Sequence, residues 1–304
     1  MTEDRRIAAV VVTYNRLAML QDLVKVLLGI DGLSEVLVVD NASTDGTREW
    51  LSGHTDHRLH GRTLTENSGG AGGFHEGLRW AVERGAGLVW LLDDDAMPDA
   101  ECLDRLLEHD GDLDFWGPVV VDLDDPERLV FPIRLPGGAR VVHEMQDVRR
   151  EAEQGLIHDI VIPFNGVLVT CALVQQIGLP RKEFFIWGDD HEYRLRAERA
   201  GARIATVVDA RVLHPSVGSL GTPMAFGRST YNDTPSDLKH YCMARNNLVN
   251  LREYGGTLHA AAFVAKTVWF YTFTRRDPGR IRLSVRAWRD ALRGDFTGHR
   301  RYLA

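Results

Sequence analysis

The sequence predicts an α/β fold: a mixed, mostly parallel sheet flanked by helices, followed by a mainly helical C-terminal extension. Apolar runs alternate with helical patterns through the first half of the chain, and polar clusters follow several of these runs directly. From Asp237 onward the pattern is helical. Strand–helix alternation is typical of sheets with parallel strands. Because ligands bind such sheets at the carboxyl ends of the strands, the polar clusters mark the expected site.

The first half of the chain begins with a clear strand and a clear helix. Ile7–Val12 is a continuous apolar run, as expected of a strand buried on both faces. Residues 17–28 place leucine and valine at helical spacing. The following predicted elements are a strand at 36–39, a short helix at 45–51, a weaker strand ending near Leu64, a helix at 73–84 and a strand at 88–92.

The second half is less regular. Residues 117–135 predict strands joined by a long acidic turn, and 138–161 predict a mobile, charged excursion. The later predicted elements are a strand at 165–170, a helix through Ile177, a loop at 187–190, a helix at 192–200, strands at 204–208 and 212–214, and two helices within 257–293. The stretch from Gly218 to Ser236, which is rich in Gly, Pro and Thr, suggests a boundary. We therefore expect a catalytic domain at 1–218, with a donor half at about 1–115 and an acceptor half at 116–218, and an extension at 219–304.

The bulk properties indicate an ordinary globular protein. A net charge of -7 over 304 residues argues against a general nucleic-acid binder. The three cysteines are far apart and form no CxxC pair, which argues against a disulfide framework or structural zinc and favours a reducing cytosol. No signal peptide is visible, and the closest approach to a membrane span, 260–273, is short and interrupted by Lys266.

An acidic triplet, Asp93, Asp94 and Asp95, follows the predicted strand at 88–92. Adjacent carboxylates repel, so a buried triplet needs a cation. Mg²⁺ and Mn²⁺ take carboxylate and phosphate oxygens together, and such an ion would neutralise a diphosphate leaving group. The alternative is an acidic, solvated turn that caps the next helix.

A glycine-rich run, Asn67-Ser68-Gly69-Gly70-Ala71-Gly72-Gly73, precedes the predicted helix at 73–84. Glycines allow a ligand to approach the backbone closely, and a helix N-terminus favours anions. The spacing is neither that of GxGxxG nor that of a P-loop. The alternative is a flexible surface loop.

Two further polar clusters end strands of the first half. Asp40, followed by Asn41, could accept hydrogen bonds from a base N–H or a ribose hydroxyl, or could belong to an ordinary turn. The segment Thr13-Tyr14-Asn15-Arg16 could hold a nucleotide by backbone contacts and stacking, or could be a helix cap with a solvated arginine.

The second half supplies Trp187, Asp189, Asp190, His191 and Glu192 in one stretch. A carboxylate beside an acceptor hydroxyl can act as a general base, and an indole can stack on a sugar. The alternative is a helix start, where Asp is favoured. Separately, His214 ends a predicted strand and could be a metal ligand or a satisfied, half-buried side chain.

At this point the sequence resembles the inverting family 2 glycosyltransferases with a GT-A fold. The motifs VVVTYNR, VVDNASTDGT, NSGGAGG and WLLDDDAMPD, the pair Asp189-Asp190, and His214 occur in that family's order over residues 7–215. More narrowly, the chain is similar to actinobacterial galactofuranosyltransferases of cell-wall galactan synthesis. The features that carry this likeness are Gly69-Gly70-Ala71-Gly72-Gly73-Phe74, Asp124-Asp125-Pro126 with Phe131-Pro132, Phe164-Asn165-Gly166, 187–193 and 274–278.

The resemblance implies an activity and a set of roles. The likeness to the enzyme that initiates galactan implies UDP-galactofuranose as donor and a polyprenyl-diphosphate-linked rhamnosyl-N-acetylglucosamine as acceptor. Asp190 would be the catalytic base. The implied donor residues are Thr13, Tyr14, Asn15, Arg16, Asp40, Asn41, Asn67, Gly69, Gly70, Gly73, Asp93 and Asp94. The implied acceptor residues are Asn165, Trp187, Asp189 and His191, and the implied ligands of Mn²⁺ or Mg²⁺ are Asp93, Asp95 and His214. His191 and Glu192 depart from the common family pattern, which leaves the role of Glu192 open.

The C-terminal helices raise the question of a membrane. The first is rich in aromatic and aliphatic residues, and the second carries arginines with apolar residues between them. Such a composition suits an anionic membrane surface, or a core helix followed by a solvated basic one. With the lipid-linked acceptor that the resemblance implies, we expect peripheral contact at the inner face of the cell membrane.

Three other functions remain open from the sequence. A dTDP-rhamnose-dependent rhamnosyltransferase would share much of the pattern. A nicotinamide-dependent dehydrogenase is suggested by the α/β pattern and glycines, but the glycine spacing argues against it. A non-catalytic sugar- or lipid-binding protein of the same fold is disfavoured because Asp93, Asp95, Asp190 and His214 occur together.

Overall fold

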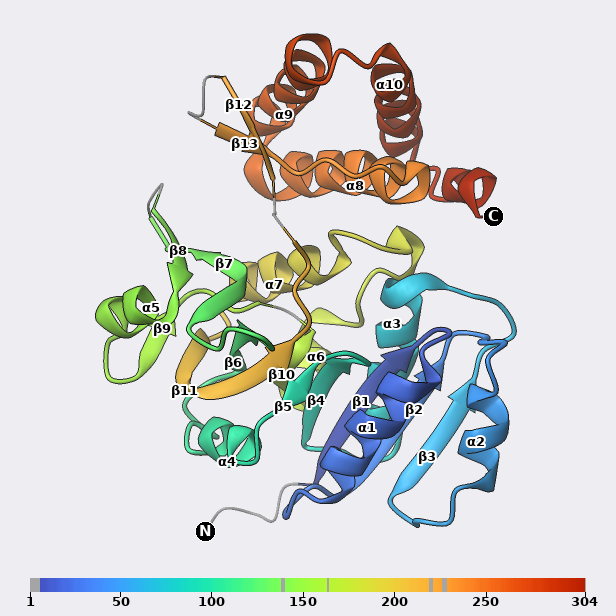
Figure 1. Ribbon diagram of the computed structural model, residues 1–304, viewed down its shortest axis with the longest axis vertical. Coiled ribbons are helices and arrows are strands. Elements are labelled where there is room, and N and C mark those ends of the chain that lie inside the picture. Colours follow the sequence, from blue (N-terminus) through green and yellow to red (C-terminus); the bar gives the residue numbers. More distant parts are fainter. Residues whose placement is uncertain (1–5, 138–139, 163, 219–220, 226–228, 304) are drawn as a thin grey trace. The chain divides into compact units, whose positions relative to one another are not determined.

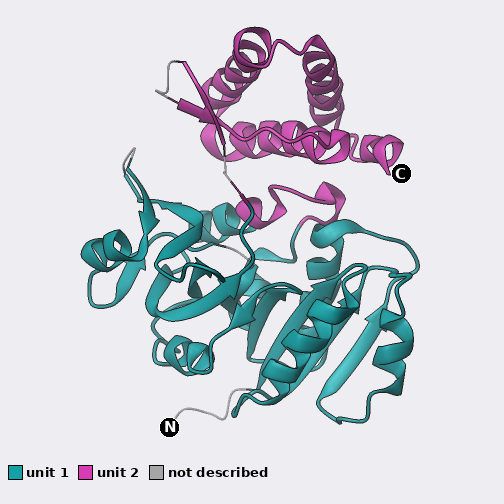
Figure 2. Cartoon of the chain, viewed as in Figure 1, with its two compact units in different colours: residues 1–180, 193–217 teal, residues 181–192, 218–304 magenta. Residues whose placement is uncertain are grey.

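The computed structural model describes residues 6–137, 140–162, 164–218, 221–225 and 229–303. The chain forms two compact units, shown in Figure 2. Unit 1 comprises Met1–Pro180 and Tyr193–Val217, and unit 2 comprises Arg181–Glu192 and Gly218–Ala304. Unit 2 therefore contains a short segment that interrupts unit 1 in the sequence.

Unit 1 is built on a mixed sheet that has eleven strands among the described residues. Four neighbouring strands are parallel, in the order β3 (Leu59–Thr63), β2 (Glu35–Asp40), β1 (Ile7–Thr13) and β4 (Leu88–Asp93). The next three are β10 (Asn165–Thr170), which is antiparallel to both of its neighbours, β6 (Phe115–Asp122), and β11 (Ile204–His214), which is parallel to β6. The shorter strands are β5 (Met97–Pro98), β7 (Arg128–Arg134), β8 (Val141–Glu144) and β9 (Leu156–His158).

Helices cover both faces of this sheet (Figure 1). Along β1, Ala9 and Val11 pack toward one face, whereas Val10 and Val12 pack toward the other. The first face is covered by α1 (Leu17–Leu28), α2 (Thr47–Gly53) and α4 (Cys102–Leu107), and the second by α3 (Gly69–Glu83), α6 (Cys171–Ile177) and α7 (Asp189–Arg199). A sheet covered on both faces explains why its strands are continuous apolar runs.

The predicted α/β class with its C-terminal helices is confirmed. The predicted strands at 7–12, 36–39, 88–92 and 165–170 are present, as is the helix at 17–28. The carboxyl ends of β1, β2 and β4 meet at one edge of the sheet, because these strands are parallel neighbours.

Several predicted elements differ from the structure. The helix predicted from Gly73 begins at Gly69, because glycines of low helix propensity are accommodated by close packing on β1. The strands predicted at 204–208 and 212–214 form one strand, β11, whose register shifts between Val207 and Arg211. The predicted mobile excursion at 138–161 contains β8, α5 (Met145–Glu151) and β9, and buries Met145 and Val148 in a small core; residues 138–139 lie outside the described ones.

Unit 2 is mainly helical. Its main helices are α8 (Asp237–Asn250), α9 (Thr257–Trp269) and α10 (Pro278–Arg293), with π-helical turns at Leu251–Gly255 and Phe270–Thr274. Its shorter elements are a hairpin of β12 (Thr222–Met224) and β13 (Ser229–Tyr231), and 3-10 helices at Lys182–Phe184 and Gly298–Tyr302. Tyr241, Ala244 and Ala287 are fully buried where α8 packs against α10. No helix among the described residues is long and apolar enough to cross a membrane.

Candidate active site

The ends of β1 and β4 are joined by polar side chains in unit 1. Thr13 Oγ1 donates to Asp94 Oδ2 at 2.8 Å, and the Arg16 guanidinium contacts Asp94 Oδ1 at 3.0 Å and Asp95 Oδ2 at 2.5 Å. Thr13 and Asp94 are buried, whereas Arg16 is half-exposed. Both carboxylate oxygens of Asp94 are thus engaged by protein groups. Arg16 is not the free, solvated side chain of the alternative interpretation.

Asp95 is brought to His214 by the short strand β5. Met97 lies opposite Leu213 in the antiparallel pairing of β5 with β11. The two residues of β5, which follow β4 in the chain, therefore lie beside the end of β11. As a result, Asp95 Oδ1 lies 3.2 Å from His214 Nε2. The other ring nitrogen, Nδ1, lies 2.7 Å from the Pro215 carbonyl oxygen. A carbonyl can only accept, so Nδ1 carries the proton and Nε2 is the atom directed at Asp95.

The three acidic and basic side chains here titrate differently. Burial outweighs the hydrogen bonds of Thr13 and Arg16 and raises the pKa of Asp94. For Asp95, burial would also raise the pKa, but the hydrogen bond and charge of His214, with Arg16, lower it. Burial alone would lower the pKa of His214, yet Asp95 outweighs it and the pKa is raised. Asp95 is accordingly an anion that attracts cations.

The residues predicted to hold a metal fit such an ion in part. Cis ligands of an octahedral ion with bonds of about 2.1 Å lie roughly 3 Å apart, close to the separation of Asp95 Oδ1 and His214 Nε2. The carboxylate oxygen and the Nε2 lone pair would repel each other unless a proton or a cation lies between them. The described residues hold no ready-made cluster of three His, Cys, Asp or Glu ligands. Asp95 and His214 can therefore form one side of a metal site that other ligands complete.

Asp93 and Asn165 lie beside this pair. The Asp93 amide donates to the carbonyl of Phe164, and Asn165 is the register partner of Leu92 across β4 and β10. Asn165 is buried, and Asp93 is partly exposed at the end of β4. Phe164 has a φ of +65° and its ring stacks on Phe74, with centroids 4.4 Å apart. The predicted acceptor residue Asn165 thus lies in unit 1, next to the acidic triplet.

Asp40 sits at the end of β2 with one oxygen unmatched. Oδ1 accepts from the Ser43 amide at 2.9 Å, while Oδ2 is buried and has no hydrogen-bond partner among the described residues. A buried acceptor without a donor costs free energy, which a ligand N–H or O–H would recover. This is the property required of the nucleotide contact predicted for Asp40.

The loop after β2 is tied to the loop after β1. The Asn15 amide donates to Ser43 Oγ, and Asn15 Oδ1 accepts from the Thr44 amide at 2.7 Å. Asp45 Oδ2 accepts from the Leu17 amide and so caps α1. Asn15 adopts a φ of +54°, which its short amide side chain tolerates. Tyr14 is left 45% exposed, available for the predicted stacking.

The glycine-rich run is held by two asparagines. Asn41 Nδ2 donates to the Gly69 carbonyl, and Asn41 Oδ1 accepts from Ser68. Asn67 Oδ1 accepts from the Gly69 amide at 2.8 Å. Both polar atoms of the Asn41 side chain therefore support the turn.

Individual glycines of the run serve different purposes. A Cβ at Gly73 would lie 2.3 Å from Val12 Cγ1, so this glycine lets α3 approach β1. A Cβ at Gly70 would meet nothing within 4 Å. Packing thus explains Gly73, whereas no atom crowds Gly70 in the first turn of α3, the end of a helix that favours an anion.

Unit 2 carries the predicted base. Asp189 is buried, Asp190 is partly exposed, and both lie in the first turn of α7. Asp190 Oδ1 accepts from the His191 amide at 2.6 Å. Trp187 is 37% exposed with a φ of +68°, and His191 is exposed. The helix predicted from Glu192 thus begins at Asp189, which places both aspartates at a helix N-terminus.

The contacts of Glu192 indicate a structural role for this residue. It is fully buried, accepts from Tyr254 Oη at 2.6 Å and lies 3.2 Å from Arg181 Nε. Arg181 also contacts both oxygens of Glu253 at 2.8 Å. Such a buried, paired carboxylate anchors the start of α7.

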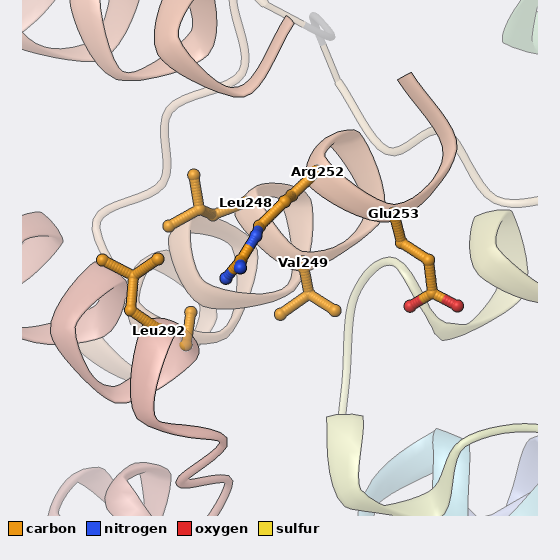
Figure 3. Close-up of a pocket in the computed structure, with 6 residues that line it drawn as sticks. Leu248, Val249, Arg252, Glu253 and Leu292 are labelled. Atoms are coloured by element: carbon orange, nitrogen blue, oxygen red, sulfur yellow. The ribbon is translucent and has the colours of Figure 1, made fainter. Parts of the chain in front are cut away.

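A cavity of about 260 Å³ lies within unit 2. It is lined by Leu248, Val249, Arg252, Glu253, Ala291 and Leu292. Figure 3 shows the Arg252 side chain extending between Leu248 and Val249 and Glu253 set to the side. None of the predicted site residues lines this cavity.

Comparisons with known proteins agree on one family. The family model described as glycosyl transferase family 2 matches residues 8–149. The galactofuranosyltransferase GlfT1 of Mycobacterium tuberculosis (strain ATCC 25618 / H37Rv) is 35% identical over 286 residues, covering 91% of this chain and 92% of that protein.

Two solved structures share the fold. The mannosyltransferase PcManGT from Pyrobaculum calidifontis, in complex with GDP-Man and Mn²⁺, has a TM-score of 0.55 at 19% identity, covering 96% of this chain and 76% of that one. Residues 1–349 of TarS from S. aureus, in complex with UDP-GlcNAc, give a TM-score of 0.54 at 19% identity, covering 97% of this chain and 81% of that one. At this identity the likeness concerns the fold.

Proposed function

The chain belongs to glycosyltransferase family 2 and has a GT-A fold, and we propose that it transfers galactofuranose from UDP-galactofuranose, with inversion and with the help of a divalent metal. The proposed acceptor is a polyprenyl-diphosphate-linked rhamnosyl-N-acetylglucosamine, as in the initiation of cell-wall galactan. The observation that carries the choice of sugar is the 35% identity to a galactofuranosyltransferase over 92% of its length.

Unit 1 would bind the donor. The buried, unmatched Oδ2 of Asp40 would accept from the nucleoside, and the open first turn of α3 at Gly70 would face the diphosphate. Asp95 and His214 would hold Mn²⁺ or Mg²⁺, with Asp93 nearby at the end of β4. The ion would supply charge stabilisation to the departing nucleoside diphosphate.

The acceptor chemistry would fall to the segment that begins α7. Asp190 is partly exposed in the first turn and would take the proton from the acceptor hydroxyl as the C–O bond forms. The acceptor oxygen would displace the nucleoside diphosphate in line, so that the anomeric carbon inverts. Trp187, exposed on one side, would pack against the acceptor sugar.

A lipid-linked acceptor would require contact with the inner face of the cell membrane, and one face of α9 favours this. Its exposed residues Leu258, Ala261, Ala265 and Val268 follow helical spacing, and Phe273 in the next turn is 62% exposed. On α10 the exposed residues include Arg282, Arg286, Arg289 and Arg293. An exposed apolar stripe together with arginines suits an anionic bilayer surface.

Calorimetric titration with UDP-galactofuranose and with dTDP-rhamnose, first with Mn²⁺ and then with a chelator, tests the proposal. Metal-dependent binding of the uridine donor is expected. Preference for the thymidine donor would move the enzyme to rhamnosyl transfer with the same fold. Binding of neither donor would contradict the donor site as a whole.

A further inference from the structure

The segment Arg181–Gly188 of unit 2 leads into α7 through an unusual backbone. Phe185 and Trp187 each have a φ of +68°, and Gly188 has a φ of +82°. Left-handed backbone is disfavoured for bulky side chains and persists only where surrounding contacts enforce it. Side chains of α8 supply hydrogen bonds to the carbonyl groups of this segment.

Asn246 of α8 is fully buried and gathers three carbonyl groups. Its Nδ2 lies 3.0 Å from the carbonyl oxygen of Phe184, 3.1 Å from that of Ile186 and 2.6 Å from that of Trp187. Because all three neighbours are acceptors, the orientation of the amide is fixed. Its other atom, Oδ1, accepts from Arg245 Nε, and the Arg245 guanidinium also contacts the Phe184 carbonyl at 2.8 Å.

Asn250 continues the same arrangement one helical turn further along α8. Its Nδ2 donates at 2.8 Å to the Gly188 carbonyl, which also accepts the first-turn hydrogen bond of α7 from the Glu192 amide at 2.9 Å. Residues four apart lie on one face of a helix, so Asn246 and Asn250 present their amides to the same stretch of backbone. The two asparagines therefore fix both Trp187 and the first turn that carries Asp190.

The opposite side of this turn is fixed by the buried ion pair already described. Glu192 is held by Arg181 and Tyr254, within the same unit. The first turn of α7 is thus held at the Gly188 carbonyl by Asn250 of α8. It is also held at the Glu192 side chain by Tyr254, in the π-helical turn that follows α8. Such constraint from both directions preorganises a reactive group before its substrate arrives.

We propose that Asn246 and Asn250 are positioning residues, which hold Asp190 and Trp187 in the orientation needed for the acceptor. They act through the carbonyl groups of 184–188 and touch no substrate themselves. The inference rests on the proposed role of Asp190 as the base. Both positions require an amide, because a carboxylate there would face carbonyl oxygens and have no N–H to donate to them.

The test compares Asn246→Asp, which is isosteric but removes the donors, with Asn247→Asp as the matched control. The Asn247 side chain makes no hydrogen bond in the part of the chain that the structure describes, and it is only partly buried. The full-length proteins are assayed below their unfolding temperatures for acceptor kcat and KM, donor Kd, and amide hydrogen exchange in 183–190.

We expect Asn246→Asp to accelerate exchange in 183–190 and to lower kcat on the order of tenfold to a hundredfold, with donor Kd unchanged. Asn247→Asp should match the native protein in each measurement. An Asn246→Asp protein that exchanges faster but keeps native kcat would overturn the positioning role. A donor Kd that weakens together with kcat would also overturn it, because that pattern indicates general loosening.

Asn250→Asp provides a second variant if Asn246→Asp does not fold, since it loses only the bond to the Gly188 carbonyl. The same increase in exchange, confined to 187–192, and a smaller loss of kcat are expected. If the native protein transfers sugar from neither donor, the proposed function fails independently, and exchange alone then decides: native exchange rates in Asn246→Asp would overturn the inference.

Discussion

Nε2 of His214 lies 3.2 Å from Oδ1 of Asp95, although the two residues are far apart in the sequence. The strand β5, only two residues long, creates this contact by pairing with β11. The two atoms have the spacing of two ligands on one metal ion, so both side chains should contribute to metal binding.

Replacement of His214 by Ala, or of Asp95 by Asn, should weaken Mn²⁺ binding by at least about tenfold, since each removes one ligand of the proposed ion. Isothermal titration of Mn²⁺ into the protein, with and without the nucleoside diphosphate, measures the change. Asp209→Asn is the control, because Asp209 is an exposed carboxylate on the same strand. Equal Mn²⁺ affinity in all four proteins would rule out this pair as ligands.

Asp190→Asn should lower kcat for sugar transfer by about 10²- to 10⁴-fold, the range lost with a general base. Donor affinity and the unfolding temperature should stay at native values, because Asp190 is partly exposed and carries no packing. Steady-state kinetics with a lipid-linked or soluble acceptor measure the loss. Glu198→Gln, an exposed change on the same helix, controls for altered helix charge. Full turnover by Asp190→Asn would remove it as the base.

Two glycines of α3 should respond oppositely to alanine. Gly73→Ala places a Cβ 2.3 Å from Val12 Cγ1 and should destabilise the protein by about 1–3 kcal/mol, as overpacking does. Gly70→Ala meets no atom within 4 Å and should leave stability unchanged or raise it, but should weaken donor binding if the diphosphate approaches there. Thermal unfolding and donor titration of both variants give the comparison. Native donor affinity in Gly70→Ala would argue against close approach at this turn.

His240 should make unit 2 sensitive to acid. Burial, followed by the charge of Arg280, lowers the pKa of His240 to about 4, with Asp237 and Asp277 acting in the opposite direction. Because Ser284 Oγ donates to the Arg280 carbonyl, it must accept from His240 Nε2–H, and Nδ1 accepts from Tyr271 Oη. Both ring nitrogens are thus satisfied only when the imidazole is neutral.

The folded-state pKa of His240 is below its unfolded value of 6.5, so the unfolded chain binds more protons between the two values. Stability is therefore present above pH 6.5 and is lost as the pH falls toward 4, by about 2 kcal/mol between pH 7.5 and 5. The difference between the native protein and His240→Gln, measured by urea-dependent hydrogen exchange of α8, isolates this contribution. The control is His57→Gln, at an exposed position, which should keep the native pH dependence of stability. If His240→Gln also keeps the native pH dependence, the prediction is wrong.

The apolar stripe of α9 should govern vesicle binding. Leu258 is 80% exposed and Phe273 is 62% exposed, and each would contribute about 1.5–3 kcal/mol if fully buried in lipid. Replacing both with Gln should therefore reduce sedimentation with anionic vesicles by more than about tenfold. Leu123→Gln, at an exposed leucine of unit 1, should have no effect. Equal sedimentation of all three proteins would place any membrane contact elsewhere.

Much of the sheet could be predicted because its strands are buried on both faces. Val10 and Val12 face one layer and Ala9 and Val11 the other, so β1 appears in the sequence as an unbroken apolar run. The position of polar residues directly after such runs was sufficient to locate Asp40 and the acidic triplet at one edge. Both the apolar run and the polar residues that end it can be read from a few consecutive residues.

The start of α3 and the role of Asn246 could not be predicted, since both depend on distant contacts. The four glycines of 69–73 have low helix propensity, and the close packing of Gly73 against Val12 helps to offset it. Asn246 is separated from the carbonyl groups it holds by about 60 residues. No periodicity or motif in α8 distinguishes this asparagine from Asn247 beside it.

The route of the chain between its two units limits how the protein can be divided. The chain enters unit 2 at Arg181, returns to unit 1 at Tyr193 and leaves again after Val217. A protein truncated after residue 218 would keep the carbonyl groups of Phe184, Ile186, Trp187 and Gly188 but lose the asparagines that satisfy them. The N-terminal portion therefore cannot be separated from the C-terminal helices without losing these hydrogen bonds. A chimaera that takes its C-terminal helices from a relative would also need that relative's 181–192 segment.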